Sequence, residues 1–258
     1  MKLNLVDTHA HIFMDHFSGD REEVISEAAG EGIGMINMGL DLPSSRRSVE
    51  LAENHRGVYA GIGYHPHEAK DFGPSALKTL LDLGVSDSVV AVGEIGLDYY
   101  RNNSPRDQQR EAFRAQLDLA LELGLPVSVH NRSSTEDMLD ILRGRTELPP
   151  GVMHSFFGDE ELAGELLDLG FHLGLSGPLT FSGESDLRDT VSKLPLDRLV
   201  LETDSPFLTP EPHRGKRNEP GYVKYVGQEL ARVRGLEAEE VAKKTTENAG
   251  RLFSLDEY

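Results

Sequence analysis

The feature that most constrains this chain is a series of short apolar runs that each end at a histidine or a carboxylate residue. The first run leads into the letters DTHAH at residues 7–11, which contain His9 and His11. The alternation of this segment favours a strand. Side chains two residues apart lie on the same face of a strand, so the two imidazoles can hold one cation. A His-x-His pair alone is weak evidence, because half-buried histidines with ordinary partners are common.

The same arrangement recurs four more times along the chain. Runs at residues 91–93, 126–129, 151–153 and 199–203 end at Glu94, His130, His154 and Asp204. Parallel-barrel enzymes carry their catalytic side chains at the C-terminal ends of the strands. The distribution of these six residues therefore predicts a metallohydrolase built on a barrel.

Strand-like and helix-like segments alternate along the chain, as in a βα barrel. The candidate strands begin at Leu3, Ile33, Val58, Val89, Val127, Gly151, Phe171 and Leu199. Helical patterns cover 20–30, 44–55, 75–83, 105–123, 134–143, 159–169 and 184–193, and 219–251 reads as closing helices. The length of 258 residues matches one (β/α)8 TIM barrel of about 250 residues. We expect a single domain over residues 1–258.

The composition limits the metal ligands and the binding partners that the chain can have. The chain has no cysteine, so metals must be held by imidazole and carboxylate, which favours hard or borderline divalent ions. The formal net charge of −18 excludes a basic face for long-range capture of nucleic acid, although metal ions can still dominate the charge of a small site. No apolar run approaches the roughly 20 residues of a membrane span, and no secretory h-region follows the start. We expect a cytoplasmic protein without a membrane partner, and a monomer.

Seven strings of the sequence resemble motifs of the TatD family of metal-dependent deoxyribonucleases. They are DTHAH (7–11), GYHPH (63–67), GEIGLDY (93–99), VHNR (129–132), HSFFG (154–158), ETDSPFL (202–208) and RGKRNEP (214–220). The resemblance runs in the family's order to about residue 220. Phe157 departs from it, because many members carry a small or hydroxylated residue there. The resemblance implies an amidohydrolase-like TIM barrel that hydrolyses phosphodiesters with two metal ions.

The resemblance also implies roles for the six predicted ligands. His9, His11 and Asp204 would hold one ion, His130 and His154 the second, and Glu94 would bridge them. Two ions (Mg²⁺, Mn²⁺ or Zn²⁺) can polarise a phosphoryl oxygen, activate water and steady the leaving oxygen. Direct attack by activated water is expected, since the chain has neither a cysteine nucleophile nor a Gly-x-Ser-x-Gly elbow.

Other residues of these motifs are candidates for catalysis and substrate binding. Asp204 could accept the proton of the water or serve only as a ligand. Glu202 could orient water or a ligand, or form a strand-end salt bridge. His65 resembles a residue that contacts the scissile phosphate, and the alternative is a structural loop histidine.

Four basic residues could bind substrate phosphate. Arg132 lies two positions after His130 and could instead lock a neighbouring carboxylate. Arg214, Lys216 and Arg217 form a dense basic patch after the eighth strand, where this fold often binds phosphate, although such a patch is usually just a solvated face. Tyr99, Phe156 and Phe157 could stack a base, with core packing as the default.

The sequence thus predicts a TatD-like metal-dependent exodeoxyribonuclease acting on single-stranded or frayed DNA ends. Metal ligands alone do not name the bond that is cut. One alternative is therefore a hydrolase of the same fold acting on another ester, such as an aminoacyl-tRNA ester or a small phosphoester. A second is a non-catalytic, metal-dependent nucleic-acid-binding protein.

Overall fold

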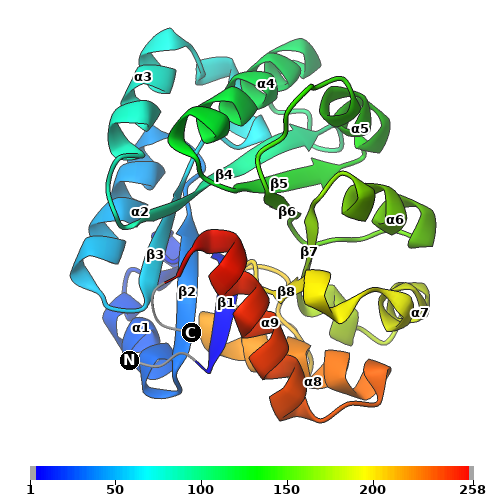
Figure 1. Cartoon of the computed structure of the whole chain (residues 1–258). Helices are drawn as coiled ribbons and strands as arrows, with labels where there is room; N and C mark the ends of the chain where they lie inside the picture. Colours follow the sequence, from blue (N-terminus) through cyan, green and yellow to red (C-terminus); the bar gives the residue numbers. More distant parts are fainter. Residues whose placement is uncertain (1–3, 256–258) are drawn as a thin grey trace.

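The protein folds into an eight-stranded parallel barrel, which a computed structural model describes for residues 4–255 (Figure 1). The strands pair in sequence order from β1 to β8. They are β1 (Leu5–Ala10), β2 (Ile33–Met38), β3 (Val58–Ile62), β4 (Val89–Asp98), β5 (Val127–Arg132), β6 (Gly151–Met153), β7 (His172–Leu175) and β8 (Leu199–Leu201). The predicted TIM barrel is confirmed. The predicted domain, 1–258, extends beyond the described residues at both ends.

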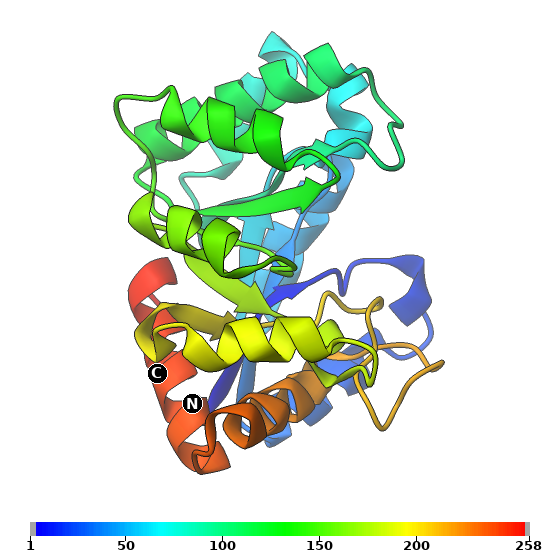
Figure 2. The same ribbon diagram turned by 90° about the vertical axis from the view of Figure 1, so that its right-hand side faces the viewer.

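Helices surround the sheet, as two perpendicular views show (Figures 1 and 2). They are α1 (Arg21–Gly30), α2 (Leu42–Asn54), α3 (Pro74–Leu83), α4 (Arg106–Leu123), α5 (Thr135–Arg143), α6 (Glu160–Asp168), α7 (Ser185–Lys193), α8 (Val223–Arg234) and α9 (Ala238–Phe253). Short 3-10 helices lie at η1 (Asp15–Phe17), η2 (Pro66–Asp71), η3 (Gly177–Thr180), η4 (Leu196–Arg198) and η5 (Pro220–Tyr222). No helix within residues 4–255 is long and apolar enough to cross a membrane.

Backbone hydrogen bonds beyond the end of β8 close the barrel against β1. The N–H of Asp204 donates to the carbonyl of His9 at 2.8 Å, and the N–H of His11 donates to that of Ser205 at 2.8 Å. Three of the six predicted ligands therefore take part in the closure itself. The metal-binding candidates of the first and last strands are positioned by the fold rather than by flexible loops.

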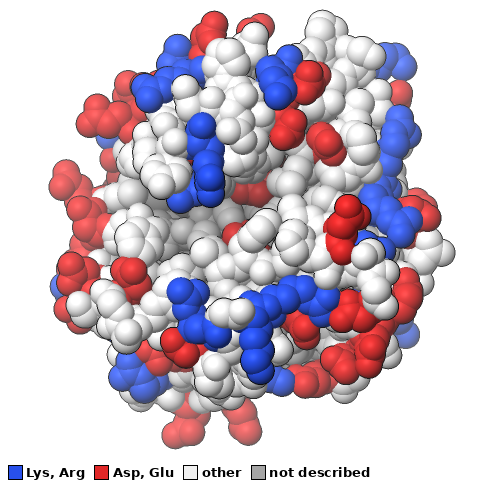
Figure 3. All heavy atoms as spheres, turned by 180° about the vertical axis from the view of Figure 1, so that it is seen from behind, with Lys and Arg blue, Asp and Glu red and all other residues white. Residues whose placement is uncertain are grey.

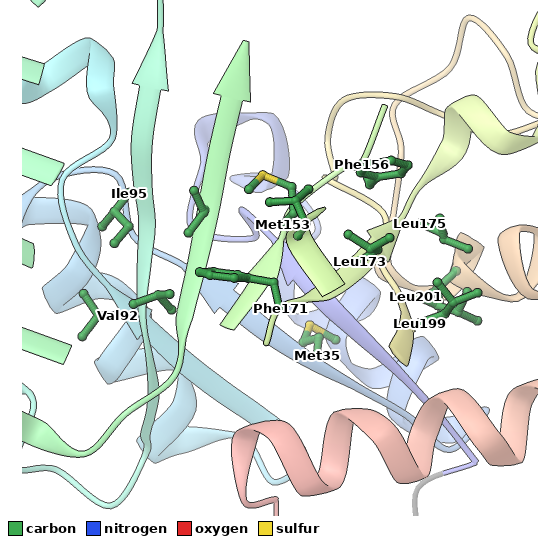
Figure 4. Close-up of a cluster of buried hydrophobic side chains, with 14 of the residues drawn as sticks. Met35, Val92, Ile95, Met153, Phe156, Phe171, Leu173, Leu175, Leu199 and Leu201 are labelled. Carbon is green, nitrogen blue, oxygen red and sulfur yellow. The ribbon is translucent and has the colours of Figure 1, made fainter. Parts of the chain in front are cut away.

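The apolar core has two parts. One lies between the sheet and the surrounding helices, where Figure 4 shows Phe171 among Met35, Met153 and Leu173. The other joins strand residues such as Val6 to Phe253 of α9, and α9 packs across that end of the barrel (Figure 1). Strands covered on both faces read as continuous apolar runs, which explains why the sequence pattern was clear. The opposite end of the barrel is left for the site.

Element boundaries differ from the predictions for identifiable reasons. Helix α2 begins at Leu42 because the carboxylate of Asp41 accepts the N–H of Ser44 at 2.9 Å as an N-cap. Strand β7 begins at His172 because the N–H of Phe171 still donates to Leu166 at the end of α6. The predicted first residue of β1, Leu3, lies outside the described residues. Strand β4 continues four residues past Glu94, since residues 95–98 pair with β5.

Replacing Phe171 by alanine is expected to lower the free energy of unfolding by about 3–5 kcal/mol, because the ring is fully buried and its loss leaves a cavity. The control is Val85→Ala, at a side chain that is 76% exposed, for which a change within about 0.5 kcal/mol is expected. Urea denaturation of both metal-free variants measures the difference. Equal transition midpoints would contradict the packing described here.

Candidate metal centre

A cavity of about 410 Å³ opens at the C-terminal ends of the strands. Figure 3 shows a hollow on the face behind that of Figure 1, with acidic side chains inside it and lysine or arginine side chains at its edges. The cavity is lined by Met14, Leu40, His65, His67, Glu68, Arg101, Arg132, Phe207 and Leu208, together with His11, Glu94, Asp98, His130, His154 and Asp204. Five of the six predicted ligands thus line one cavity, and the sixth, His9, contacts them from below.

The first group of donors comes from β1, β4 and the segment after β8. His9 Nε2 lies 3.3 Å from His11 Nε2 and 3.3 Å from Glu94 Oε2. Asp204 Oδ1 lies 3.4 Å from His11 Nε2. All four side chains are largely buried. Two imidazoles and two carboxylates are therefore directed at one small volume.

The second group forms around the other oxygen of the same glutamate. Glu94 Oε1 lies 2.8 Å from His130 Nδ1 and 3.8 Å from His154 Nε2. His65 Nε2 is 3.6 Å from this oxygen. The carboxylate of Glu94 thus presents Oε2 to one set of imidazoles and Oε1 to another, which is the geometry of a bridging ligand.

Hydrogen bonds behind the ligands determine which ring nitrogen carries a proton. His11 Nδ1 lies 2.8 Å from the carbonyl of Met38, which can only accept, so Nδ1 is the donor and the neutral ring has its lone pair at Nε2. The ring of His130 lies between two carboxylates, with Nε2 3.2 Å from Asp98 Oδ2 and Nδ1 2.8 Å from Glu94 Oε1. A neutral ring that donates from Nε2 to Asp98 has its lone pair at Nδ1. Both lone pairs face carboxylate oxygens of the cluster.

His65 differs from the other histidines in this respect. Its Nδ1 accepts the backbone N–H of His67 at 3.1 Å, so the neutral ring carries its proton on Nε2. Although ligand atoms of His65, Glu94 and His130 lie within 4.8 Å of one another, an Nε2–H cannot bind a metal. It can donate a hydrogen bond to a substrate oxygen in the cavity. Burial, in addition, holds the pKa of His65 well below its usual range.

The donor set fits divalent metal ions. Neutral imidazole lone pairs facing carboxylate oxygens at about van der Waals distance repel each other unless a positive charge lies between them. Burial alone would lower the pKa of His11, but hydrogen bonds that its ring donates to Asp204 and Glu94 raise it to about 10. Burial likewise opposes protonation of His154, and the charge of Glu202 prevails and raises its pKa to about 9. The pocket therefore favours cations, either protons or metal ions.

Two carboxylates orient the ligands from behind. Asp98 accepts from Nε2 of both His130 and His67 through Oδ2, at 3.2 and 3.0 Å, and its Oδ1 accepts the backbone N–H of Arg101 at 2.8 Å. Burial opposes the charge on Asp98, yet the hydrogen bond from His130 and that backbone N–H hold its pKa well below the usual range. Asp98 was not predicted from the sequence, although its place four residues after Glu94 in the same strand was the available signal.

Glu202 lies behind His154 rather than in the cavity. Its Oε1 is 2.8 Å from His154 Nδ1 and also accepts the backbone N–H of Ser155 at 2.5 Å. Its other oxygen, Oε2, occupies the space beside Gly174, where an added Cβ would lie only 2.3 Å away. Glu202 is completely buried. Its position is that of a residue that orients a ligand.

A third carboxylate, Asp7, positions Asp204. Asp7 accepts the backbone N–H and the hydroxyl of Thr203 at 2.8 and 2.6 Å. Asp204 follows with a left-handed backbone conformation (φ 57°), which turns its side chain away from the regular path of β8. Glu202 and Asp204 therefore do not project alike, as they would from a regular strand. Burial raises the pKa of Asp7 to about 8, in spite of the hydrogen bonds from Thr203.

The four basic residues predicted to bind substrate fall into two places. Arg132 lines the cavity, with its guanidinium 4.1 Å from the ring centroid of Tyr100. Arg217 pairs with Asp20 at 2.7 Å, and the guanidinium of Arg214 lies 3.7 Å from the ring centroid of Phe181. Arg214, Lys216 and Arg217 do not belong to the cavity lining. Arg101, which the sequence analysis did not consider, does.

The three aromatic residues that were candidates for stacking a base also lie in different places. The hydroxyl of Tyr99 donates to Asp137 at 2.6 Å, and Phe156 is buried in the core. Phe157 is 61% exposed but is not part of the cavity lining. Phe207, which the analysis quoted only within a motif, is 45% exposed and lines the cavity.

The pH dependence of metal binding follows from the raised pKa values of His11 and His154. Metal ions bind the deprotonated rings, so these protons must leave. Since both folded-state pKa values lie above 6.5, affinity should keep rising from pH 6.5 to 8.5 instead of levelling off near 7. Calorimetric titration of manganese in buffers of different ionisation enthalpy should show net proton release at pH 7.5. Binding without proton release would contradict the assignment.

Removing the charge of Asp98 should weaken metal binding about 10- to 100-fold, because His130 would lose the partner that fixes its tautomer. The change is Asp98→Asn, and the control is Asp137→Asn, whose carboxylate pairs with Arg110 and Tyr99 outside the cavity. Competition with a chromophoric chelator measures the affinity. Equal affinities for the two variants would show that Asp98 does not orient His130.

Comparison with known proteins shows the family of this chain. A model of the family described as TatD related DNase matches residues 6–254. The uncharacterized metal-dependent hydrolase YabD of Bacillus subtilis is 44% identical over 254 residues, which are 98% of this chain and all of YabD. The 3'-5' ssDNA/RNA exonuclease TatD of Klebsiella pneumoniae is 34% identical, with 98% of each chain covered.

A solved structure supports the same relationship. The crystal structure of YJJV, a TatD homologue from Escherichia coli, matches with a TM-score of 0.92 at 33% identity, covering 99% of this chain and 100% of YJJV. The predicted family and the predicted metal-dependent hydrolase acting on ester bonds are thereby confirmed. With the matched residues spanning the barrel and all six candidate ligands, the chain belongs to the TatD family of metal-dependent hydrolases.

Proposed function

We propose that this enzyme hydrolyses phosphodiester bonds at the ends of single-stranded or frayed DNA, with two divalent metal ions (Mg²⁺, Mn²⁺ or Zn²⁺) in the cavity. The observation that carries the proposal is the division of one carboxylate between two sets of imidazoles, with Glu94 Oε2 facing His9 and His11 and Oε1 facing His130 and His154. A single ion would need only one of these sets. A pair of ions is the arrangement suited to a phosphoryl centre.

We assign His9, His11 and Asp204 to one ion, His130 and His154 to the other, and Glu94 to both. When bound, such ions would polarise the phosphoryl oxygen, lower the pKa of the attacking water and neutralise charge on the leaving oxygen. Asp204 lines the cavity and its pKa is held low, since the neighbouring His11 and His154 outweigh burial. Its carboxylate can therefore accept the proton of the attacking water at neutral pH.

Groups above the ligands are placed to hold the phosphate. His65 presents Nε2–H beside Glu94, where it donates to a phosphoryl oxygen of the bound ester. Arg132 adds a fixed positive charge at the edge of the cavity. Arg214, Lys216 and Arg217 remain candidates for contacts farther along the strand.

DNA ends suit this cavity better than internal duplex. The net charge of −18 opposes binding along a duplex, whereas a single terminal nucleotide needs only local cations and the metal ions. The Klebsiella relative is a 3'-5' ssDNA/RNA exonuclease by name, which supports single-stranded substrates and makes that direction the first to test. We still predict that the protein is a monomer and that it is located in the cytoplasm.

The decisive experiment uses chelator-stripped protein with magnesium, manganese or zinc restored, and single-stranded DNA labelled at either end. We expect stepwise shortening from one end, and a loss of more than about 100-fold in Glu94→Ala, since this variant removes a ligand of both ions. The control Glu239→Ala changes a glutamate in the first turn of α9, at the far end of the barrel, and should leave the rate unchanged.

The other outcomes identify the alternatives. Protein that binds two ions yet cleaves no DNA with any metal would contradict the proposal, and a panel of aminoacyl-tRNA esters and small phosphoesters would then find the substrate. Tight stoichiometric DNA binding without turnover would indicate a non-catalytic nucleic-acid-binding protein.

A further inference from the structure

The cavity above the metal centre has two chemically different walls. The β8, β1 and β2 side carries Met14, Leu40, Phe207 and Leu208. The β4 and β5 side carries the two guanidinium groups of the lining, Arg101 and Arg132. Since β8, β1 and β2 lie opposite β4 and β5 in the barrel order, an apolar wall faces a cationic wall across the ligand floor.

Phe207 is the most exposed side chain of the apolar wall. It is 45% exposed, whereas Met14, Leu40 and Leu208 are half-buried. The imidazole of His16 meets its ring in an edge-on contact, with centroids 6.0 Å apart. An exposed aromatic ring inside a functional cavity leaves apolar surface in water, which binding of a flat apolar group would remove.

The backbone that carries Phe207 is rigidly held. Its N–H donates to the carbonyl of Asp204 at 2.8 Å. Its carbonyl accepts Nδ2 of Asn218 at 2.6 Å, and the same nitrogen donates to the carbonyl of Thr203 at 2.9 Å. Asn218 is completely buried. The backbone of Phe207 is thus held beside Asp204, so only the side chain has to be ordered when a ligand binds.

We propose that Phe207, backed by Met14, Leu40 and Leu208, is the stacking surface for the base of the nucleotide next to the scissile phosphate. The inference rests on the proposed function. A nucleotide combines a flat ring with a phosphate, and the cavity offers an aromatic wall for the ring, a ligand floor for the phosphate and a cationic wall for the next phosphate along the strand. In a duplex the faces of a base are covered by its neighbours, so this surface selects an unpaired nucleotide.

The test compares two single strands that differ only in the nucleotide at the cleaved end, which carries either a base or an abasic tetrahydrofuran residue. Phe207→Ala should lower kcat/KM on the strand with the base about 5- to 150-fold, the range of one base–aromatic stack. On the abasic strand it should change kcat/KM less than about twofold. Phe207→Tyr keeps the ring and should retain the preference for the base.

Phe157→Ala is the matched control, because it removes another exposed phenylalanine at the same end of the barrel but outside the cavity lining. It should change neither rate. Equal losses on both strands in Phe207→Ala would overturn the inference, since a disturbed ligand site would slow both alike. No cleavage of either strand by the unaltered enzyme would instead reject the proposed function, and the stacking surface with it.

Discussion

The carboxylate of Glu94 is the group on which the rest of the site depends. Each of its oxygens faces a different set of imidazole nitrogens, and the side chain is almost completely buried. Buried lone pairs and negative charge are stable together only if cations share the space. The barrel is suited to this problem, because strands that are distant in sequence end around one axis and can direct six ligands at a volume of a few ångströms.

The hydrogen-bond partners behind the imidazole rings orient the candidate ligands. The carbonyl of Met38 fixes the tautomer of His11, and Asp98 fixes that of His130. The same reasoning leads us to propose that His65 contacts substrate rather than a metal ion, because a backbone N–H occupies its Nδ1. Proximity alone would have placed all of these histidines around metal ions. The hydrogen bonds on the far side of each ring separate the ligands from the proton donor.

Much of the fold could be predicted because both faces of each strand are covered, which leaves a clear apolar pattern and places the ligands at its ends. That His9 and Asp204 lie close together could also be predicted from the sequence, since parallel strands finish at one end of the barrel. Other features depend on conformations that no local pattern encodes. Asp204 turns through a left-handed residue, and the orientation of Phe207 follows from that turn. Arg217 pairs with Glu219 of its own motif and with Asp20, 197 positions away, and its basic motif gave no sign of the distant ion pair.

We propose that two ions share the carboxylate of Glu94. Crystals of the manganese-loaded enzyme, measured at the manganese absorption edge, test it directly. We expect two anomalous peaks, one bounded by His9, His11, Asp204 and Glu94 Oε2, and the other by Glu94 Oε1, His130 and His154. A single peak, or an ion bound to Nε2 of His65, would contradict it.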